Sequence, residues 1–133
     1  MDDGIVDFLN NKNIKVFGPN QKVSQLEGSK IFTKKICEKY NIPTAKFGIF
    51  KNQEDTFKFL QYSKMPLVIK SDGLAAGKGV YICKDMESSK NAVSEIFNGK
   101  FGNADQILVE EFLEGEEMSY FIISDGLSYK SFN

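Results

Sequence analysis

The apolar residues of this chain recur with two different periods, and the period changes from segment to segment. Apolar residues three or four positions apart are typical of amphipathic helices, whereas alternation or a short apolar run is typical of strands. The first pattern predicts helices over residues 3–11, 29–40, 52–63 and 85–97. The second predicts strands over residues 14–17, 45–50, 67–70, 80–83, 106–112 and 117–123, with a further strand beginning at Leu127.

Capping and turn residues support several of these boundaries. Ser29, Asn52 and Asp85 each stand immediately before a helical pattern, where a side-chain oxygen can accept a hydrogen bond from a first-turn N–H. Asp125-Gly126 separates two strand patterns and is a hairpin signal. Residues 21–28 have a mixed pattern, so we interpret them as a connector with a single helical turn.

The order of the predicted elements indicates an α+β protein. Residues 44–133 would form a mostly antiparallel sheet with two packed helices. Residues 1–19 are interpreted as the last helix and strand of an α/β N-terminal domain, and residues 20–43 as a helical connector. The front helix and strand have no sheet to join, and the final hairpin ends abruptly. We therefore expect the chain to be a piece of a larger enzyme.

Composition narrows the possible partners. The chain has 17 basic and 18 acidic residues, which gives a formal net charge of -1, and no stripe of basic residues breaks this balance. There is accordingly no electrostatic reason to expect binding to a nucleic-acid polymer. No apolar run approaches the roughly 20 residues that span a bilayer. These features predict a cytoplasmic protein that acts on small molecules, with its oligomeric state left open.

Histidine is absent, which removes the usual general base near neutral pH and the commonest metal ligand. A Ser-His or Cys-His nucleophile pair therefore cannot be formed within this chain. Cys37 and Cys83 lie far apart in apolar patterns, and we interpret them as small buried thiols rather than metal ligands. The chemistry is expected to depend on lysines, carboxylates, backbone amides and a bound ion.

The first candidate site is the segment VIKSDGLAAGKGV at residues 68–80. It places Lys70 at the end of a predicted strand, before a loop that contains three glycines and a second lysine. The N–H groups of such a loop can surround phosphate oxygens, because glycine has no Cβ in the way. The spacing matches neither a Walker A loop nor the dinucleotide fingerprint. A nucleotide site is one interpretation, and a tight surface loop is the other.

The second candidate site is the segment VEEFLEGEE at residues 109–117, which places five carboxylates at and beyond a strand end. Alternation turns Glu110 and Phe112 to one side and Glu111 and Leu113 to the other. Such a strand end can hold a purine, because its backbone groups can read the adenine edge while an apolar side chain covers the ring. A solvated acidic turn is the alternative.

Together these segments resemble the ATP-grasp ligases, and within them the phosphoribosylamine–glycine ligase (glycinamide ribonucleotide synthetase) family. The resemblance extends over residues 4–133. It includes VFGP at residues 16–19, QLEGSK at residues 25–30 and IPTA at residues 42–45. The resemblance implies the central ATP-binding domain of that fold, preceded by a connector.

The resemblance also implies roles for individual residues. Lys30 and Lys70 would contact ATP phosphates, and the glycine-rich loop would close over the phosphates as a lid. The implied binding residues of that loop are Asp72, Gly73, Gly77, Lys78 and Gly79. A solvated helix residue is the alternative for Lys30.

The adenine-reading segment would be Glu110, Glu111, Phe112 and Leu113. The carboxylate that binds the ribose would be that of Glu117, with Glu116 as the alternative.

The activity implied for the parent enzyme is ATP-dependent ligation of glycine to 5-phosphoribosylamine through an acyl phosphate, which gives glycinamide ribonucleotide for purine synthesis. The implied cofactors are ATP and Mg²⁺ or Mn²⁺, with the metal ligands and much of the glycine and phosphoribosylamine site outside this chain. The chain alone is therefore expected to be inactive. Three alternatives remain: another ATP-grasp carboxylate–amine ligase or carboxylase, a nucleotide-binding module without catalysis, and a purely structural α+β fragment.

Overall fold

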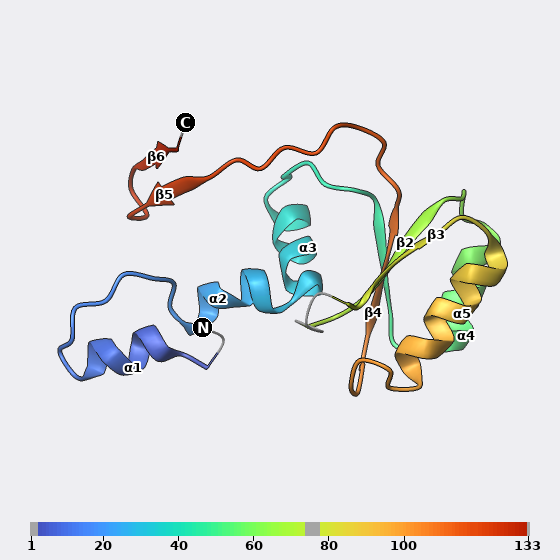
Figure 1. Ribbon diagram of the computed structural model, residues 1–133, viewed down its shortest axis with the longest axis horizontal. Coiled ribbons are helices and arrows are strands. Elements are labelled where there is room, and N and C mark those ends of the chain that lie inside the picture. The colour runs from blue at the N-terminus through green and yellow to red at the C-terminus, as the bar shows by residue number, and fades with distance from the viewer. Residues whose placement is uncertain (1–2, 74–77, 133) are drawn as a thin grey trace.

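The computed structural model describes residues 3–73 and 78–132. Its helices are α1 (Ile5–Asn11), α2 (Gln21–Gly28), α3 (Lys30–Lys39), α4 (Gln53–Gln61) and α5 (Met86–Phe97). Its strands are β1 (Phe47–Phe50), β2 (Leu67–Ser71), β3 (Val80–Cys83), β4 (Ile107–Glu111), β5 (Ile122–Ser124) and β6 (Tyr129–Ser131). Figure 1 shows β1 to β4 between two layers, with α3 on one side and the α4–α5 pair on the other.

The helix starts agree closely with the capping signals in the sequence. Ser29 accepts a hydrogen bond from the N–H of Phe32 and begins α3. Asp85 begins α5 through a capping box with Ser88, in which each side chain is bonded to the other residue's backbone. These side-chain oxygens satisfy N–H groups that have no partner inside the helix, which is why each helix begins at that residue.

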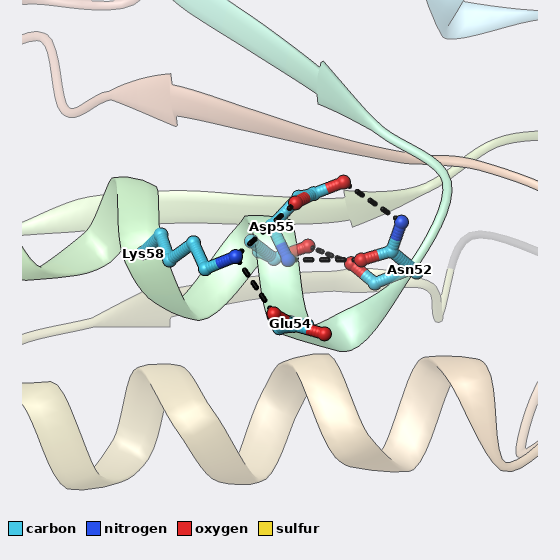
Figure 2. Close-up of polar contacts among 5 residues, drawn as sticks. Asn52, Glu54, Asp55 and Lys58 are labelled. Carbon is cyan, nitrogen blue, oxygen red and sulfur yellow. Dashed lines mark hydrogen bonds and ion pairs between the residues drawn. The ribbon is translucent and has the colours of Figure 1, made fainter.

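Asn52 begins α4, the helix with labelled side chains in Figure 2. Its side chain accepts from the N–H of Asp55 and donates to the carboxylate of the same residue. Lys58 forms an ion pair with Glu54 one turn earlier, with 2.7 Å between Nζ and Oε1. These local contacts define the first turns of α4.

The main sheet is four-stranded, in the order β1-β4-β2-β3, and every pair is antiparallel. The predicted α+β class with a mostly antiparallel sheet is confirmed. The central strand β4 has β1 on one side and β2 on the other, with Glu110 opposite Phe47 in one pair and Val68 in the other. This register determines which side chains of β2 and β4 share a face.

One face of this sheet holds the hydrophobic core. Helices α4 and α5 pack against each other and cover this face, as Figure 1 shows. The buried core residues are Leu60, Leu67, Ile69, Cys83, Ala92, Val93, Ile96, Ile107 and Val109. Because side chains alternate along a strand, the residues between them in β2 and β4, including Lys70 and Glu110, lie on the opposite face.

Three predictions about the outer segments were wrong. Residues 14–17 form no strand, and Phe17 is 76% exposed. Only residues 122–123 of the predicted strand 117–123 lie in a strand, β5, which extends to Ser124 and pairs with β6. An isolated strand leaves its backbone groups without partners, and among the described residues no strand is paired with residues 14–17 or 117–120. Conversely, residues 21–28 form a complete helix, α2, rather than a connector with one turn.

Candidate functional site

A groove of about 430 Å³ lies on the face of the sheet opposite the core. Its size is within the range of small-molecule sites. It is lined by Lys34, Pro43, Thr44, Ala45, Val68, Lys70, Glu110, Glu111, Phe112 and Leu113. Five of the residues predicted to bind the nucleotide therefore lie around one cavity, namely Lys70, Glu110, Glu111, Phe112 and Leu113.

The pairing of β2 with β4 brings Lys70 to Glu110. In this antiparallel pair Lys70 is opposite Leu108, and Val68 is opposite Glu110. Lys70 and Glu110 are thus diagonal neighbours on the groove face, a separation that a long side chain can bridge. The Lys70 ammonium forms an ion pair with Glu110 Oε2.

Glu110 is at the centre of a buried cluster of charges. Its side chain is 3% exposed and is paired with Lys34 of α3 as well as with Lys70. A buried carboxylate without partners would be strongly destabilising, and two ammonium groups compensate for its lost hydration. Sequence analysis gave Glu110 a role through its backbone only and did not identify Lys34. The available signal was the four-residue spacing from Lys30 to Lys34, which places both lysines on one face of the helix.

The start of the glycine-rich segment is attached to the N-terminus of α3. The Ser29 hydroxyl donates to both carboxylate oxygens of Asp72, at 3.1 and 3.0 Å. The N–H of Ile31 donates to Asp72 Oδ1 at 3.2 Å. A carboxylate at this position is favoured by the unpaired N–H groups and partial positive charge of a helix N-terminus.

Lys30 lies beside this attachment and donates to the carbonyl oxygen of Gly73 at 2.5 Å. Burial lowers the pKa of the Lys30 ammonium, the nearby Asp72 carboxylate raises it, and the positive charge of Lys70 lowers it again. The structure therefore brings the two predicted phosphate-binding lysines close enough to repel each other. Gly73 has a φ of 85°, a conformation that residues with a Cβ rarely adopt.

The far side of the loop is joined to the near side at its base. The N–H of Ser71 donates to the carbonyl oxygen of Gly79 at 2.8 Å. Gly79 is buried and Lys78 is exposed. Gly77, with the middle of the predicted lid, lies outside the described residues.

The residues of the predicted adenine-reading segment differ in whether their backbone groups are already hydrogen-bonded. Glu111, the last residue of β4, is hydrogen-bonded to Lys46: its N–H donates to the carbonyl of Lys46 at 2.9 Å and its carboxylate accepts from the N–H of Lys46 at 2.8 Å. Strand β4 ends at Glu111. Within the described chain, Phe112 and Leu113 make no backbone hydrogen bond, so their N–H and C=O groups are available at the groove.

The structure does not bring Glu117 or Glu116 into the groove. Both are exposed and lie in the segment between β4 and β5, where residues 112–121 belong to no strand. The choice between them as ribose-binding residue remains a prediction.

Two further properties concern the described residues as a whole. Across residues 3–73 and 78–132, no three His, Cys, Asp or Glu side chains are grouped so that they could hold a metal ion. In the same ranges, none of the helices has the length and apolar character needed to cross a membrane.

The chain is similar to curated proteins named phosphoribosylamine–glycine ligase. The chain is 45% identical over 124 residues to phosphoribosylamine–glycine ligase of Brucella melitensis, covering 92% of this chain and 29% of the relative. It is 45% identical over 128 residues to the enzyme of the same name from Lactococcus lactis, covering 96% and 30%. The chain thus spans about 30% of the length of these curated relatives.

Solved structures agree with this similarity. The phosphoribosylamine–glycine ligase of Thermotoga maritima superimposes with a TM-score of 0.82 at 36% identity, covering 87% of this chain and 30% of that one. The biotin carboxylase domain of Hydrogenobacter thermophilus 2-oxoglutarate carboxylase, solved with MgADP, ADP and bicarbonate, has a TM-score of 0.62 at 27% identity over 81% of this chain and 25% of that one.

The D-alanine–D-alanine ligase of Coxiella burnetii shares the fold, with a TM-score of 0.77 at 21% identity over 98% of this chain and 39% of that one. The predicted ATP-grasp fold is confirmed by these neighbours. Residues 28–133, most of the chain, match the family model for the phosphoribosylglycinamide synthetase ATP-grasp (A) domain. The chain belongs to this family.

Proposed function

We propose that this chain provides the ATP-binding part of a phosphoribosylamine–glycine ligase. The observation that carries the proposal is the groove, where Lys34, Lys70 and a strand end with free backbone groups lie around one cavity. The similarity to a domain solved with MgADP and ADP supports a nucleotide as the occupant. Membership of the family supports the same reaction for the parent enzyme.

In this proposal the phosphates lie toward Lys70 and Lys30, and the base lies toward Phe112 and Leu113. An ammonium that donates to a phosphate oxygen forms a charge-assisted hydrogen bond, which is stronger than a neutral one. The free N–H and C=O groups of residues 112–113 can read the edge of adenine, and the Phe112 ring can cover one face. Glu117 would bind the ribose hydroxyls if residues 114–121 approach the groove when the nucleotide binds.

The loop between Asp72 and Gly79 would exclude water from the phosphates. This matters for the proposed chemistry, because ligation through an acyl phosphate requires protection of that group from hydrolysis. The groups that Asp72 and Gly73 contact on α3 would hold the near end of the loop in place.

A divalent metal does not fit the described wall of the groove. Its buried carboxylate, Glu110, is already neutralised by two lysines, and those lysines would repel a cation. We therefore propose that the ligands for Mg²⁺ or Mn²⁺ lie outside this chain, and we assign no step of the reaction to a metal here.

Calorimetric titration with ATP tests the proposal. The full chain is expected to bind ATP, and Lys70→Ala is expected to weaken binding by roughly 1.5–3 kcal/mol, the range for a hydrogen bond to a charged group. Lys90→Ala is the matched control, because this exposed lysine lies on α5, across the sheet from the groove. Absence of ATP binding by the wild-type chain would overturn the proposal, and equal affinity in the folded Lys70 variant would remove Lys70 from the site.

A further inference from the structure

Lys34 is the lysine of the buried cluster that is most completely held by the protein. Its ammonium pairs with Glu110, donates to Thr44 Oγ1 at 2.5 Å, and donates to the carbonyl of Ala45 at 3.4 Å. It also lies 5.5 Å from the centre of the Phe47 ring. An ammonium has three N–H donors, and Thr44 and Ala45 accept from two of them, while the ion pair with Glu110 balances the charge of Lys34. The side chain is 12% exposed.

Lys70 is held differently. In the described part of the chain, Glu110 is its only polar partner. Its side chain is 27% exposed and lines the groove. Within the described residues no hydrogen bond holds the Lys70 ammonium, whereas the Lys34 ammonium already donates two.

The two lysines share one carboxylate, so the cluster of Lys34, Glu110 and Lys70 carries one net positive charge. With an uncharged residue in place of Lys34, Glu110 and Lys70 would form a pair with no net charge. An anion in the groove would then be repelled by Glu110 as well as attracted by Lys70. The interaction between charges is strengthened when they are partly removed from water, and Glu110 is only 3% exposed.

We propose that Lys34 is a positioning residue for the phosphate-binding site. Lys34 neutralises and orients Glu110, and Glu110 in turn directs the Lys70 ammonium into the groove. The cluster keeps one net positive charge. Lys34 itself does not touch the ligand. The proposal rests on the proposed function, since it takes the anion in the groove to be the phosphates of a nucleotide. The proposal gives a role to Lys34, which lies outside both the glycine-rich segment 68–80 and the acidic segment 109–117.

The test compares a charged and an uncharged ligand. Lys34→Met is expected to weaken ATP binding roughly tenfold, the scale of losing one nearby charge in a partly screened site. Adenosine lacks phosphates, so its affinity is expected to change less than about twofold by the same reasoning. Lys35→Met is the matched control, because the adjacent Lys35 on the same helix is exposed; it is expected to bind both ligands as the wild type does.

A charge rescue separates this role from a general structural one. Lys34→Met combined with Glu110→Gln removes one positive and one negative charge and restores the single net positive charge. This double variant is expected to regain ATP affinity to within about threefold of wild type, which corresponds to a coupling between the two sites. Lys34→Arg, which keeps the charge, is expected to bind ATP more tightly than Lys34→Met. Thermal unfolding of each variant verifies that it is folded.

If Lys34→Met does not fold, the comparison moves to the Glu110→Gln background, where no buried carboxylate needs a partner. There Lys34→Met still removes one positive charge from the cluster, so the proposal expects weaker ATP binding, with adenosine affinity changed by less than about twofold. Unchanged ATP binding in folded Lys34→Met, or a double variant that binds no better than the folded single variant, would overturn the inference while leaving ATP binding by the wild type intact. Failure of the wild type itself to bind ATP would overturn both proposals.

Discussion

At the scale of single residues, the predicted phosphate-binding lysines differ in their present partners. Lys70 is paired with a carboxylate, whereas Lys30 donates to the carbonyl of Gly73. Lys30 is partly buried and lies near Asp72 and Lys70. Its environment in the free protein therefore disfavours the charged form relative to a lysine in water, and an anion that enters the groove would reverse that preference.

This reversal predicts proton uptake on ATP binding. Burial lowers the pKa of Lys30 in the free protein below its ordinary value of 10.5, and bound phosphate would raise it again. Between the two pKa values the bound form holds a proton that the free form lacks, so affinity should fall as pH rises through the lowered pKa of Lys30. Calorimetry at alkaline pH in two buffers of different ionisation enthalpy would measure the uptake.

The control for this measurement is Lys30→Gln, which has no proton to gain at that position. We expect the buffer dependence to disappear in this variant. An equal proton uptake in the wild type and in Lys30→Gln would assign the effect to another group.

At the scale of elements, α3 has the largest influence on the site. Its first turn holds Asp72 and Gly73, and its second turn places Lys34 against Glu110. Ser29 has two functions there, because its hydroxyl oxygen caps the helix and its hydroxyl hydrogen is directed to Asp72. The position of the glycine-rich segment is therefore coupled to the N-terminus of α3.

This coupling predicts different outcomes for two similar cap variants. Ser29→Ala should reduce the free energy of unfolding by about 0.5–2 kcal/mol, the range for loss of a cap. It should also weaken ATP binding, because Asp72 loses one of the two donors that hold it. Asn20→Ala removes the cap of α2, where Asn20 accepts from the N–H of Val23, and should reduce stability without the same loss of affinity. Denaturant unfolding and ATP titration of both variants provide the measurement. Equal loss of affinity in the two would argue against a specific role for the Asp72 attachment.

At the scale of the whole molecule, the two faces of the main sheet have different roles: one packs the hydrophobic core and the other carries the proposed binding site. The face toward α4 and α5 is apolar and buried, while the opposite face carries the charged cluster and the groove. The chain spans about 30% of its curated relatives. A ligation in which ATP phosphorylates one substrate and the second substrate then displaces phosphate depends on holding all three molecules in a reactive geometry.

We therefore predict that the 133-residue chain binds ATP without catalysing ligation. In the presence of ATP, glycine, phosphoribosylamine and Mg²⁺, ADP release should not exceed that of a heat-denatured sample. An assay of ADP formation with and without glycine would measure this. Glycine-dependent ADP release by the pure chain would contradict the prediction and would place a working ligase site within these residues.

Much of the fold could be predicted from the sequence where short-range chemistry decides it. The borders of β3 and α5 were correct, because an apolar run and the Asp85 cap act within a few residues. The groove was predictable in part. The residues Lys70 and 110–113 were identified from their patterns and from the family resemblance, and the structure brings them together around one cavity.

What the sequence by itself determined is therefore the identity of the capped helices, the inner strands and the segments that line the groove, since each depends on neighbouring residues. Only the tertiary structure decided that Glu110 pairs with Lys34 and Lys70, because this cluster joins α3, β2 and β4. It also decided that residues 14–17 and 117–121 form no strand. Alternating apolar residues favour an extended backbone, but a strand forms only where a second strand satisfies its hydrogen bonds, and that partner is a property of the whole fold.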